Sequence, residues 1–197
     1  MVAKSSNMFS SKDLNTIERL IWDYFQQGVR NKKSAFHYPT IGTFSKSSFS
    51  LRTVILRNVI RKERTISFYT DDRSKKIKEL KDNKNIFIHI YDKKNQVQVQ
   101  SEGKAQIFNK SKLNKEIWNS FSSYAKSIYL SKKAPGKKII NENEDLKLLD
   151  IKKGFENFSI VKAKINKITF LKLNEKVNHK AFFKYKSKNN SFFWVVP

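Results

Sequence analysis

The sequence predicts a mainly β fold, a small antiparallel barrel whose ends and sides are covered by helices. Around seven segments alternate between apolar and polar residues, as the strands of a half-buried sheet do. The connections between them are short, and helical periodicity is confined to a few segments. Hydrophobic residues make up 39% of the 197 residues, which is sufficient for a packed core.

A helix is predicted over about residues 11–28. Ser10 or Ser11 stands where an N-cap is needed, and Gly28 marks the expected end. Apolar residues recur within it at helical spacing, namely Leu14, Ile17, Ile21, Tyr24 and Phe25. We expect the barrel to occupy about residues 35–197, with helical insertions, and residues 1–197 to form a single domain.

The other elements follow in chain order. Strand patterns occupy residues 35–44, 48–60, 64–70, 85–92, 96–108, 157–173, 181–186 and 191–197. Helical patterns occupy residues 75–83 and 110–130, and a short helix is expected from the end of the loop 131–145 through Leu149. Neither an internal repeat nor a Pro- or Ser-rich linker divides the chain.

The net charge of +24 is the most unusual feature of the composition. Such a charge attracts polyanions. However, Lys outnumbers Arg 34 to 7, the lysines are spread along the whole chain, and Lys, Asn, Ile and Phe all have A/T-rich codons. Base composition therefore accounts for much of the excess. We expect at most a nonspecific, salt-sensitive attraction to nucleic acid.

Several classes of site are excluded or disfavoured. The chain has no Cys, no apolar run near the ~20 residues that span a bilayer, and no apolar signal-peptide region in MVAKSSNMFSSKDLN. A soluble cytoplasmic protein is therefore expected. His37, His89 and His179 lack metal-ligand spacing, and no nucleophile or nucleotide-loop motif is present. We expect no metal site, and an enzyme of this kind would use a bound cofactor.

Arg52 is the first candidate site residue. Strand alternation places it on one face with Val54 and Leu56, and places Thr53, Ile55 and Arg57 on the other. A cation on an apolar face either reaches to water at the rim of the barrel or binds an anion. The sequence alone leaves both interpretations open.

The stretch FYTDDRSKKIKEL, residues 68–80, joins a strand to a helix. Thr70 ends the strand and Ser74 can cap the helix, whose first turn carries Lys75 and Lys76. Free N–H groups at a helix start, with cations beside them, form a phosphate site. A solvated turn in a lysine-rich protein is the alternative.

Gln98 is a further candidate, in the strand pattern 96–108. It alternates with Val97 and Val99, and its amide can bind the polar edge of a heterocycle or simply face solvent.

These segments, in this order, resemble the FMN-binding split β-barrel family that includes pyridoxamine 5'-phosphate oxidase. The matching core is RTVILR (52–57), FYT (68–70), SKK (74–76) and QVQVQSEG (96–103). The lead-in KSAFHYPTIGTF and the closing strands are also similar. The resemblance covers nearly the whole chain and implies a mainly β split barrel with flanking helices.

The resemblance also implies roles for individual residues. Arg52 and Lys76 would hold the FMN phosphate, with help from Ser74 and Lys75, and Tyr69 and Thr70 would contact the phosphate end. Thr53, Val54 and Ile55 would lie along the isoalloxazine and ribityl chain. Arg57 stands where the family often has Lys near the flavin, and Gln98 would contact the polar edge of the ring. The family forms homodimers with the flavin between subunits.

The substrate end departs from the family pattern. Positions of a stacking Trp and two Arg residues of the oxidase correspond here to Leu171, Ala181 and Val177, and the ending is more similar to a bacterial subgroup of flavin-binding relatives. We therefore expect an FMN-dependent oxidoreductase that acts on a small molecule. The alternatives are a genuine pyridoxamine 5'-phosphate oxidase, a flavin-binding protein without turnover, and a nucleic-acid-binding barrel.

Overall fold

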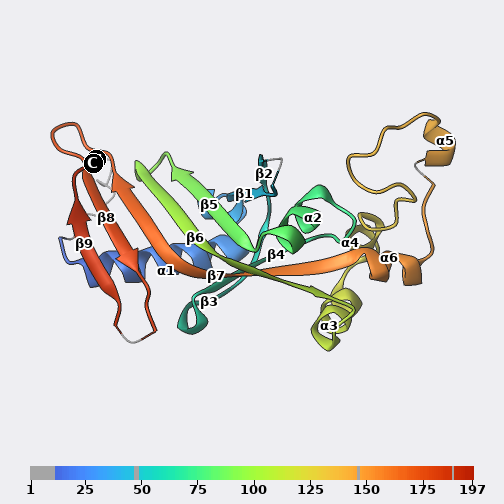
Figure 1. Ribbon diagram of the computed structural model, residues 1–197, viewed down its shortest axis with the longest axis horizontal. Helices are drawn as coiled ribbons and strands as arrows, with labels where there is room; N and C mark the ends of the chain where they lie inside the picture. The colour runs from blue at the N-terminus through green and yellow to red at the C-terminus, as the bar shows by residue number, and fades with distance from the viewer. Residues whose placement is uncertain (1–11, 47–48, 146, 188) are drawn as a thin grey trace, which may run out of the picture.

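A computed structural model describes residues 12–46, 49–145, 147–187 and 189–197, and Figure 1 shows its arrangement. The strands are β1 (Thr40–Phe44), β2 (Phe49–Thr53), β3 (Leu56–Ile60), β4 (Thr65–Asp71), β5 (Asn85–Asp92), β6 (Val97–Asn109), β7 (Phe158–Lys172), β8 (His179–Lys184) and β9 (Ser191–Val195). The α-helices are α1 (Leu14–Arg30), α2 (Lys75–Asp82), α3 (Lys112–Ser120), α4 (Ser123–Ser127), α5 (Glu142–Asp145) and α6 (Ile151–Asn157). Two short 3₁₀ helices, η1 (Ala35–His37) and η2 (Arg61–Glu63), complete the elements described.

All nine strands belong to one antiparallel sheet. Its order is β2-β1-β5-β6-β7-β4-β3, and β8 and β9 continue from the far end of β7. The early part of β7 pairs with β4 and its later part with β8, so the long strands β6 and β7 run through both halves of the sheet. The sheet is not closed, which is consistent with a split barrel. The predicted fold class is confirmed.

The long strands bend where β6 passes Gly103. The pairing between β6 and β7 shifts register between Glu102 and Gly103. A Cβ atom at residue 103 would lie 2.4 Å from the carbonyl oxygen of Lys164, so only glycine lets the two backbones approach this closely. The bend divides the strands into the two halves of the open sheet.

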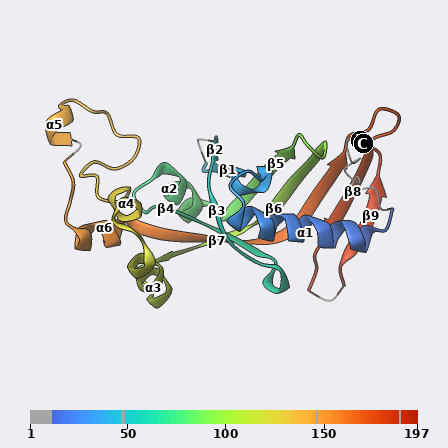
Figure 2. The same ribbon diagram turned by 180° about the vertical axis from the view of Figure 1, so that it is seen from behind.

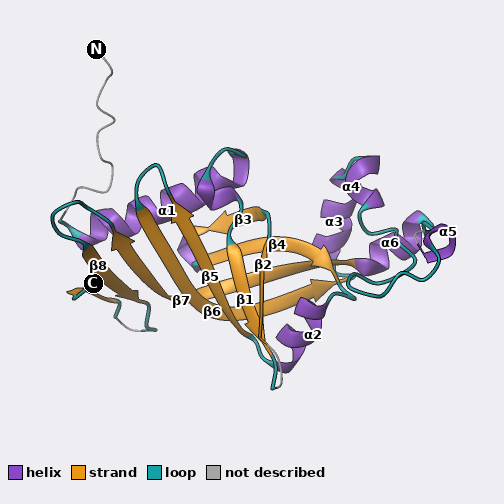
Figure 3. Ribbon diagram, turned by 90° about the horizontal axis from the view of Figure 1, so that it is seen from above, coloured by secondary structure: helices purple, strands orange, loops and turns teal. Residues whose placement is uncertain are grey.

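Helix α1 lies across one face of the sheet and supplies much of its core, as Figures 2 and 3 show. Ile17, Ile21 and Phe25 are fully buried, as their helical spacing predicts. Asp13 caps the helix with its side chain, while the expected caps Ser10 and Ser11 lie outside the described residues. The helix passes Gly28 and ends at Arg30, because Gly28 serves a close contact with η1 rather than a C-cap.

Two predicted strands are interrupted. Residues 35–37 form the 3₁₀ helix η1 before β1 begins, and the segment 48–60 is divided into β2 and β3. The break follows from pairing, because Thr53 still faces Thr40 of β1 whereas Leu56 faces Phe68 of β4. Residues 54 and 55 carry the chain from one strand partner to the other.

The helices α3, α4 and α6 gather at one end of β6 and β7, with α5 lying furthest from the sheet (Figure 1). An aromatic cluster around the buried Trp118, Tyr129 and Phe158 holds this end together. The expected helix 110–130 is divided at Phe121, and Ser122 caps α4 with its hydroxyl. Helix α6 was not predicted, and the helix expected through Leu149 is only the short α5. None of the described helices is both long and apolar enough to span a membrane.

Candidate functional site

Four predicted residues meet where β2, β4 and α2 converge. Nζ of Lys76 donates to Oγ1 of Thr70 at 3.0 Å, and the hydroxyls of Thr70 and Ser74 lie 3.4 Å apart. Burial lowers the pKa of Lys76, and the positive charge of Arg52 lowers it further. Thr70 and Ser74 are buried, and the side chains of Arg52 and Lys76 are partly exposed. We call Arg52, Thr70, Ser74 and Lys76 the anion cradle.

The turn after β4 positions these groups. Asp71 accepts hydrogen bonds from the backbone N–H of Arg73 at 2.8 Å and from its guanidinium, and its own carbonyl accepts the N–H of Ser74 at 3.1 Å. Ser74 is the N-cap of α2, but its side chain makes no capping hydrogen bond. Its hydroxyl therefore stays directed toward Thr70. The first N–H groups of α2 have no intrahelical acceptor and lie at the same end of the helix.

Arg52 is held in place by the buried Glu79 of α2. Nη2 of Arg52 lies 3.0 Å from Oε2 of Glu79, and Nη1 donates to the hydroxyl of Thr43. Burial alone would raise the pKa of Glu79, but hydrogen bonds from Ser50, Thr43 and Arg52 outweigh it and lower the pKa to about 2. The carboxylate is thus ionised throughout the ordinary pH range, and it fixes the Arg52 guanidinium beside the cradle.

The cradle carries excess positive charge. The pKa of Lys76 is lowered, first by burial and then by the like charge of Arg52, and Asp71 and Glu79 offset this only in part. Lys75 also lies here, 3.6 Å from Glu79. Three cations thus share one carboxylate, since Asp71 is paired with Arg73. Two hydroxyls and two net positive charges at a helix start form a site for a dianion.

Arg73 has a structural role instead of a role in the cradle. Its Nη1 donates to the carbonyl oxygens of Ser131 at 3.0 Å and Lys132 at 3.2 Å, while Nη2 binds Asp71 at 2.7 Å. The guanidinium therefore ties the segment after α4 to the turn that carries the cradle. No sequence spacing indicated this contact.

The predicted residues of the segment 53–57 lie beside the cradle but face different ways. Val54 is buried in the core, whereas Thr53, Ile55 and Arg57 are exposed, as the predicted alternation requires. The backbone N–H of Val54 donates to the carbonyl oxygen of Pro39 at 3.0 Å, so the side chains of Thr53, Ile55 and Arg57 are the exposed groups of this segment.

Tyr69 points away from Thr70, into the aromatic cluster. Its ring lies 5.3 Å from that of Phe158 and 5.7 Å from that of Phe121, and the Arg57 guanidinium lies 5.6 Å from it. Burial raises the pKa of Tyr69, and Arg57 opposes this effect. The side chain of Tyr69 therefore stands apart from the cradle, on the other side of β4.

The structure does not bring Gln98 to the cradle. Gln98 is opposite Tyr91 of β5 and Leu171 of β7, on the outer face of the sheet, whereas Arg52 shares the inner face with Ile41 and Ile88. Thr53 also faces outward. A ligand that contacts both Arg52 and Gln98 must pass from one face to the other or lie between two chains.

The outer face near Gln98 is apolar and hollow. Its exposed side chains include Phe49, Leu51, Phe87 and Tyr91. Leu51 and Phe87 also line a cavity of about 280 Å³, which is formed by residues of β1, β2, β5 and β6. Large apolar side chains gathered in this way are typical of a face that binds a ligand or another protein.

Residues 20–109 match the family described as pyridoxamine 5'-phosphate oxidase, FMN-binding domain. The matched range is just under half of the chain, 90 of 197 residues. It contains every residue of the anion cradle, together with Glu79 and Gln98. The resemblance inferred from the motifs is confirmed.

Solved structures extend the similarity to the rest of the chain. A pyridoxamine 5'-phosphate oxidase-related, FMN binding protein from Nostoc punctiforme superimposes with a TM-score of 0.71 at 14% identity, over 91% of this chain and 96% of that one. PhzG from Burkholderia lata, solved with tetrahydrophenazine-1-carboxylic acid, gives 0.69 at 13% identity, over 100% and 98%. At these identities the similarity establishes the pyridoxamine 5'-phosphate oxidase-like fold. Comparison with curated protein sequences finds no significant match.

Proposed function

We propose that this chain binds FMN through the anion cradle and acts as an oxidoreductase on a small molecule. The observation that carries the proposal is the cation pair Arg52–Lys76, set beside two hydroxyls at the start of α2. A terminal phosphate carries about −1.5 to −2 charge at neutral pH. It would balance the two net positive charges that Arg52, Lys75 and Lys76 leave beside Glu79.

The other residues fit a flavin mononucleotide better than a bare phosphate. Thr53 and Ile55 offer exposed side chains in the segment that directly follows Arg52. FMN, when bound, supplies hydride transfer. The residues of this chain would bind the phosphate, orient the cofactor and exclude water from it.

We propose further that the chain acts as a homodimer with one cofactor between two copies. Arg52 and Gln98 lie on opposite faces of the sheet, so a ligand that lies on one face of a single chain contacts only one of them. The exposed Leu51, Phe87 and Tyr91 beside Gln98 supply an apolar face that a second copy would cover. Gln98 of one copy would then approach a cofactor held by the cradle of the other.

The substrate is proposed to differ from pyridoxamine 5'-phosphate. Ala181 is fully buried in the core, Val177 is exposed between β8 and β7, and Leu171 lies beside Gln98. None of these side chains can donate to a phosphate. The lysines of residues 132–138 are the nearby alternatives, and Lys133 is already paired with Asp145 at 2.5 Å.

The absorbance spectrum of the purified protein tests the central proposal. We expect flavin bands in the isolated protein, or quenching of FMN fluorescence on titration with micromolar or tighter affinity. A colourless protein that leaves FMN fluorescence unchanged would refute it. Oxidisable and reducible small molecules added to the FMN-loaded protein then test turnover, and bound FMN without any turnover would leave a flavin-binding role alone.

A further inference from the structure

A second site lies on the other side of α2. A cavity of about 1020 Å³ opens between the C-terminal end of α2, the start of β4 at Thr65, the end of β6 from Lys104 to Asn109, and the first half of β7. Lys81, Lys84, Lys104, Lys162 and Lys164 line it, together with the acids Glu63 and Asp72. None of the cradle residues contributes. We call this cavity the basic groove.

The basic groove holds cations that the protein itself does not neutralise. Lys162 lies 3.6 Å from Glu63 and Lys81 lies 3.5 Å from Asp72. The remaining three, Lys84, Lys104 and Lys164, are exposed and form no ion pair with any residue in the described ranges. The groove is therefore a region of unbalanced positive charge.

Two of these lysines are placed against each other at a cost in stability. Lys104 of β6 and Lys164 of β7 are direct partners in the antiparallel pairing, so their side chains leave the same face side by side. Like charges in this position are destabilising. Lysines do protect exposed strand edges, but edge protection involves the edge strand alone, whereas these cations come from the α2–β5 turn, β6 and β7. The arrangement favours an anion that lies among them.

The floor of the groove supplies further donors. Strand β5 pairs with β6 only as far as Lys104, and from Ala105 to Asn109 β6 is paired on its other side alone. The N–H of Ala105 donates to the carbonyl oxygen of Lys84 at 2.7 Å. The two-residue period of a strand then directs the backbone N–H of Ile107 to the same free edge. This N–H group below and the ammonium groups at the rim both select anions.

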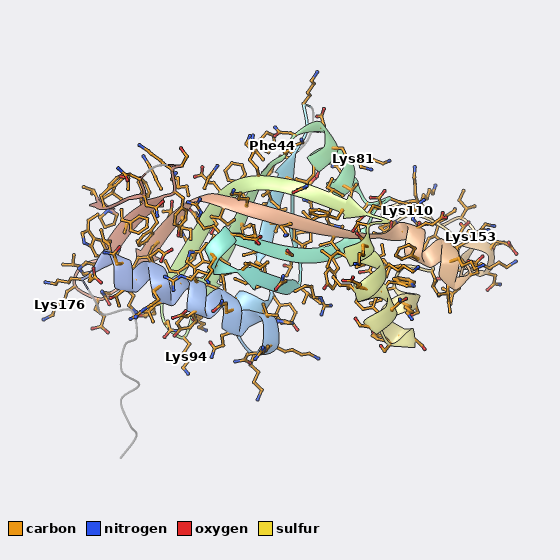
Figure 4. All side chains as sticks on the ribbon, turned by 90° about the horizontal axis from the view of Figure 1, so that it is seen from below. Phe44, Lys81, Lys94, Lys110, Lys153 and Lys176 are labelled. Carbon is orange, nitrogen blue, oxygen red and sulfur yellow. The ribbon has the colours of Figure 1, made fainter. Side chains whose placement is uncertain are left out.

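We propose that the basic groove binds the phosphate backbone of a single-stranded nucleic acid. The cradle gathers its cations at the start of one helix, whereas the cations of the groove come from α2, the α2–β5 turn, β6 and β7, which suits a chain of phosphates better than a single one. Lys81 in Figure 4 marks the side of α2 on which the groove lies. The lining includes no aromatic side chain on which a base could stack, so binding is independent of sequence.

A matched pair of triple variants separates this groove from the general charge of the protein. The groove variant is K84Q/K104Q/K164Q, and the control is K94Q/K153Q/K176Q, whose exposed lysines lie elsewhere on the surface (Figure 4). Both variants lose three positive charges. All three proteins, in full length, are titrated into a labelled oligothymidylate at several salt concentrations, and anisotropy gives the affinity. A melting temperature no lower than that of the unaltered protein, together with unchanged FMN uptake, confirms that both variants fold.

We expect the groove variant to flatten the dependence of log K on log salt by about 2, since each lost phosphate contact removes about 0.7 for a single strand. The control variant should reduce this slope by less than half of the change seen in the groove variant. Equal effects of the two variants, or no binding by the unaltered protein at low salt, would overturn the proposal. A third outcome would also overturn it, namely that the groove variant loses pyrophosphate binding but keeps oligothymidylate binding. The groove would then be a site for a small phosphate compound. Tighter binding of a duplex of the same length, weakened equally by both variants, would assign the attraction to the overall charge.

Discussion

Oε2 of the buried Glu79 lies 3.0 Å from Nη2 of Arg52, so a carboxylate of α2 fixes the cation that β2 contributes to the anion cradle. The pair has two consequences that can be measured separately. Arg52 stabilises the fold through Glu79 and is proposed to bind the ligand, whereas Lys76 has no carboxylate among the ion pairs of the described chain.

Lys76→Ala is expected to weaken FMN binding roughly 10- to 100-fold without loss of stability, because it removes one charge-assisted phosphate contact of about 1.5–3 kcal/mol. Fluorescence titration and thermal unfolding measure the two effects. Lys153→Ala, at an exposed position of α6, is the control. Equal FMN affinity in both variants would mean that the phosphate lies elsewhere.

Arg52→Ala is expected to weaken FMN binding similarly and also to destabilise the fold by about 2–3 kcal/mol, because it leaves the buried carboxylate of Glu79 without its cation. The sequence alone gave no reason to expect this second effect. Denaturant unfolding compares it with Lys76→Ala. A stability equal to that of the unaltered protein would show that Thr43 and Ser50 satisfy Glu79 by themselves.

Glu79→Gln is expected to remove part of the acid sensitivity of the fold. The pKa of Glu79 is about 2 in the folded protein against an ordinary 4.5, so its contribution to stability is complete above pH 4.5 and is lost as the pH falls toward 2. The variant should be less stable at neutral pH, and its stability should vary less between pH 4.5 and 2. Parallel curves for the two proteins across this range would contradict the assignment.

FMN affinity is expected to fall at alkaline pH earlier than an ordinary lysine would allow. Burial and Arg52 lower the pKa of Lys76, and a bound phosphate would stabilise the ammonium and raise it again. Affinity is therefore complete while Lys76 is charged and declines as the pH rises through the lowered pKa. Dissociation constants measured from pH 7 to about 10 test this. Lys76→Ala should lack the decline, and an identical profile in the variant would exclude Lys76 as its source.

Phe87→Asp is expected to separate the proposed dimer, because it places a charge on the apolar face beside Gln98. Sedimentation should show dimers for the unaltered protein and monomers for the variant. Tyr124→Asp is the control, since Tyr124 is 80% exposed on α4, away from that face. A flavin-loaded monomer in the unaltered protein would rule out a cofactor held between two copies.

Much of the cradle could be predicted from the sequence because it is local. Thr70, Ser74 and Lys76 belong to one strand-turn-helix segment, and the spacing of seven consecutive residues fixes their meeting. Arg52 could be placed on the inner face by alternation. The burial of its partner Glu79 could not be predicted, because the sequence KKIKELKDN is typical of a surface helix. Only the pairing of β1 with β2 brings Thr43, Ser50 and Arg52 together against this helix.

Other features depend on pairing that the sequence does not display. RTVILR is a continuous run of strand-forming residues, and only the change of partner from β1 to β4 breaks it at residues 54–55. Gln98 alternates with buried valines as predicted, yet its position on the face opposite Arg52 follows from the strand order. Local sequence patterns therefore predict which way a side chain points, whereas the strand order of the sheet determines which residues it contacts.

The pairing of β6 with β7 has a consequence for the protein during its synthesis. Asn109 pairs with Ser159 and Val97 with Lys172, which are 50 and 75 residues further along the chain. When β6 leaves the ribosome, its partner β7 has not yet been made, and one long edge of β6 stays unpaired while helices α3 to α6 are translated. Such long-range pairing is slow to form and exposes nascent chains to misassociation. The nascent chain therefore cannot complete the centre of its sheet until translation has passed Lys172, long after the cradle residues have emerged.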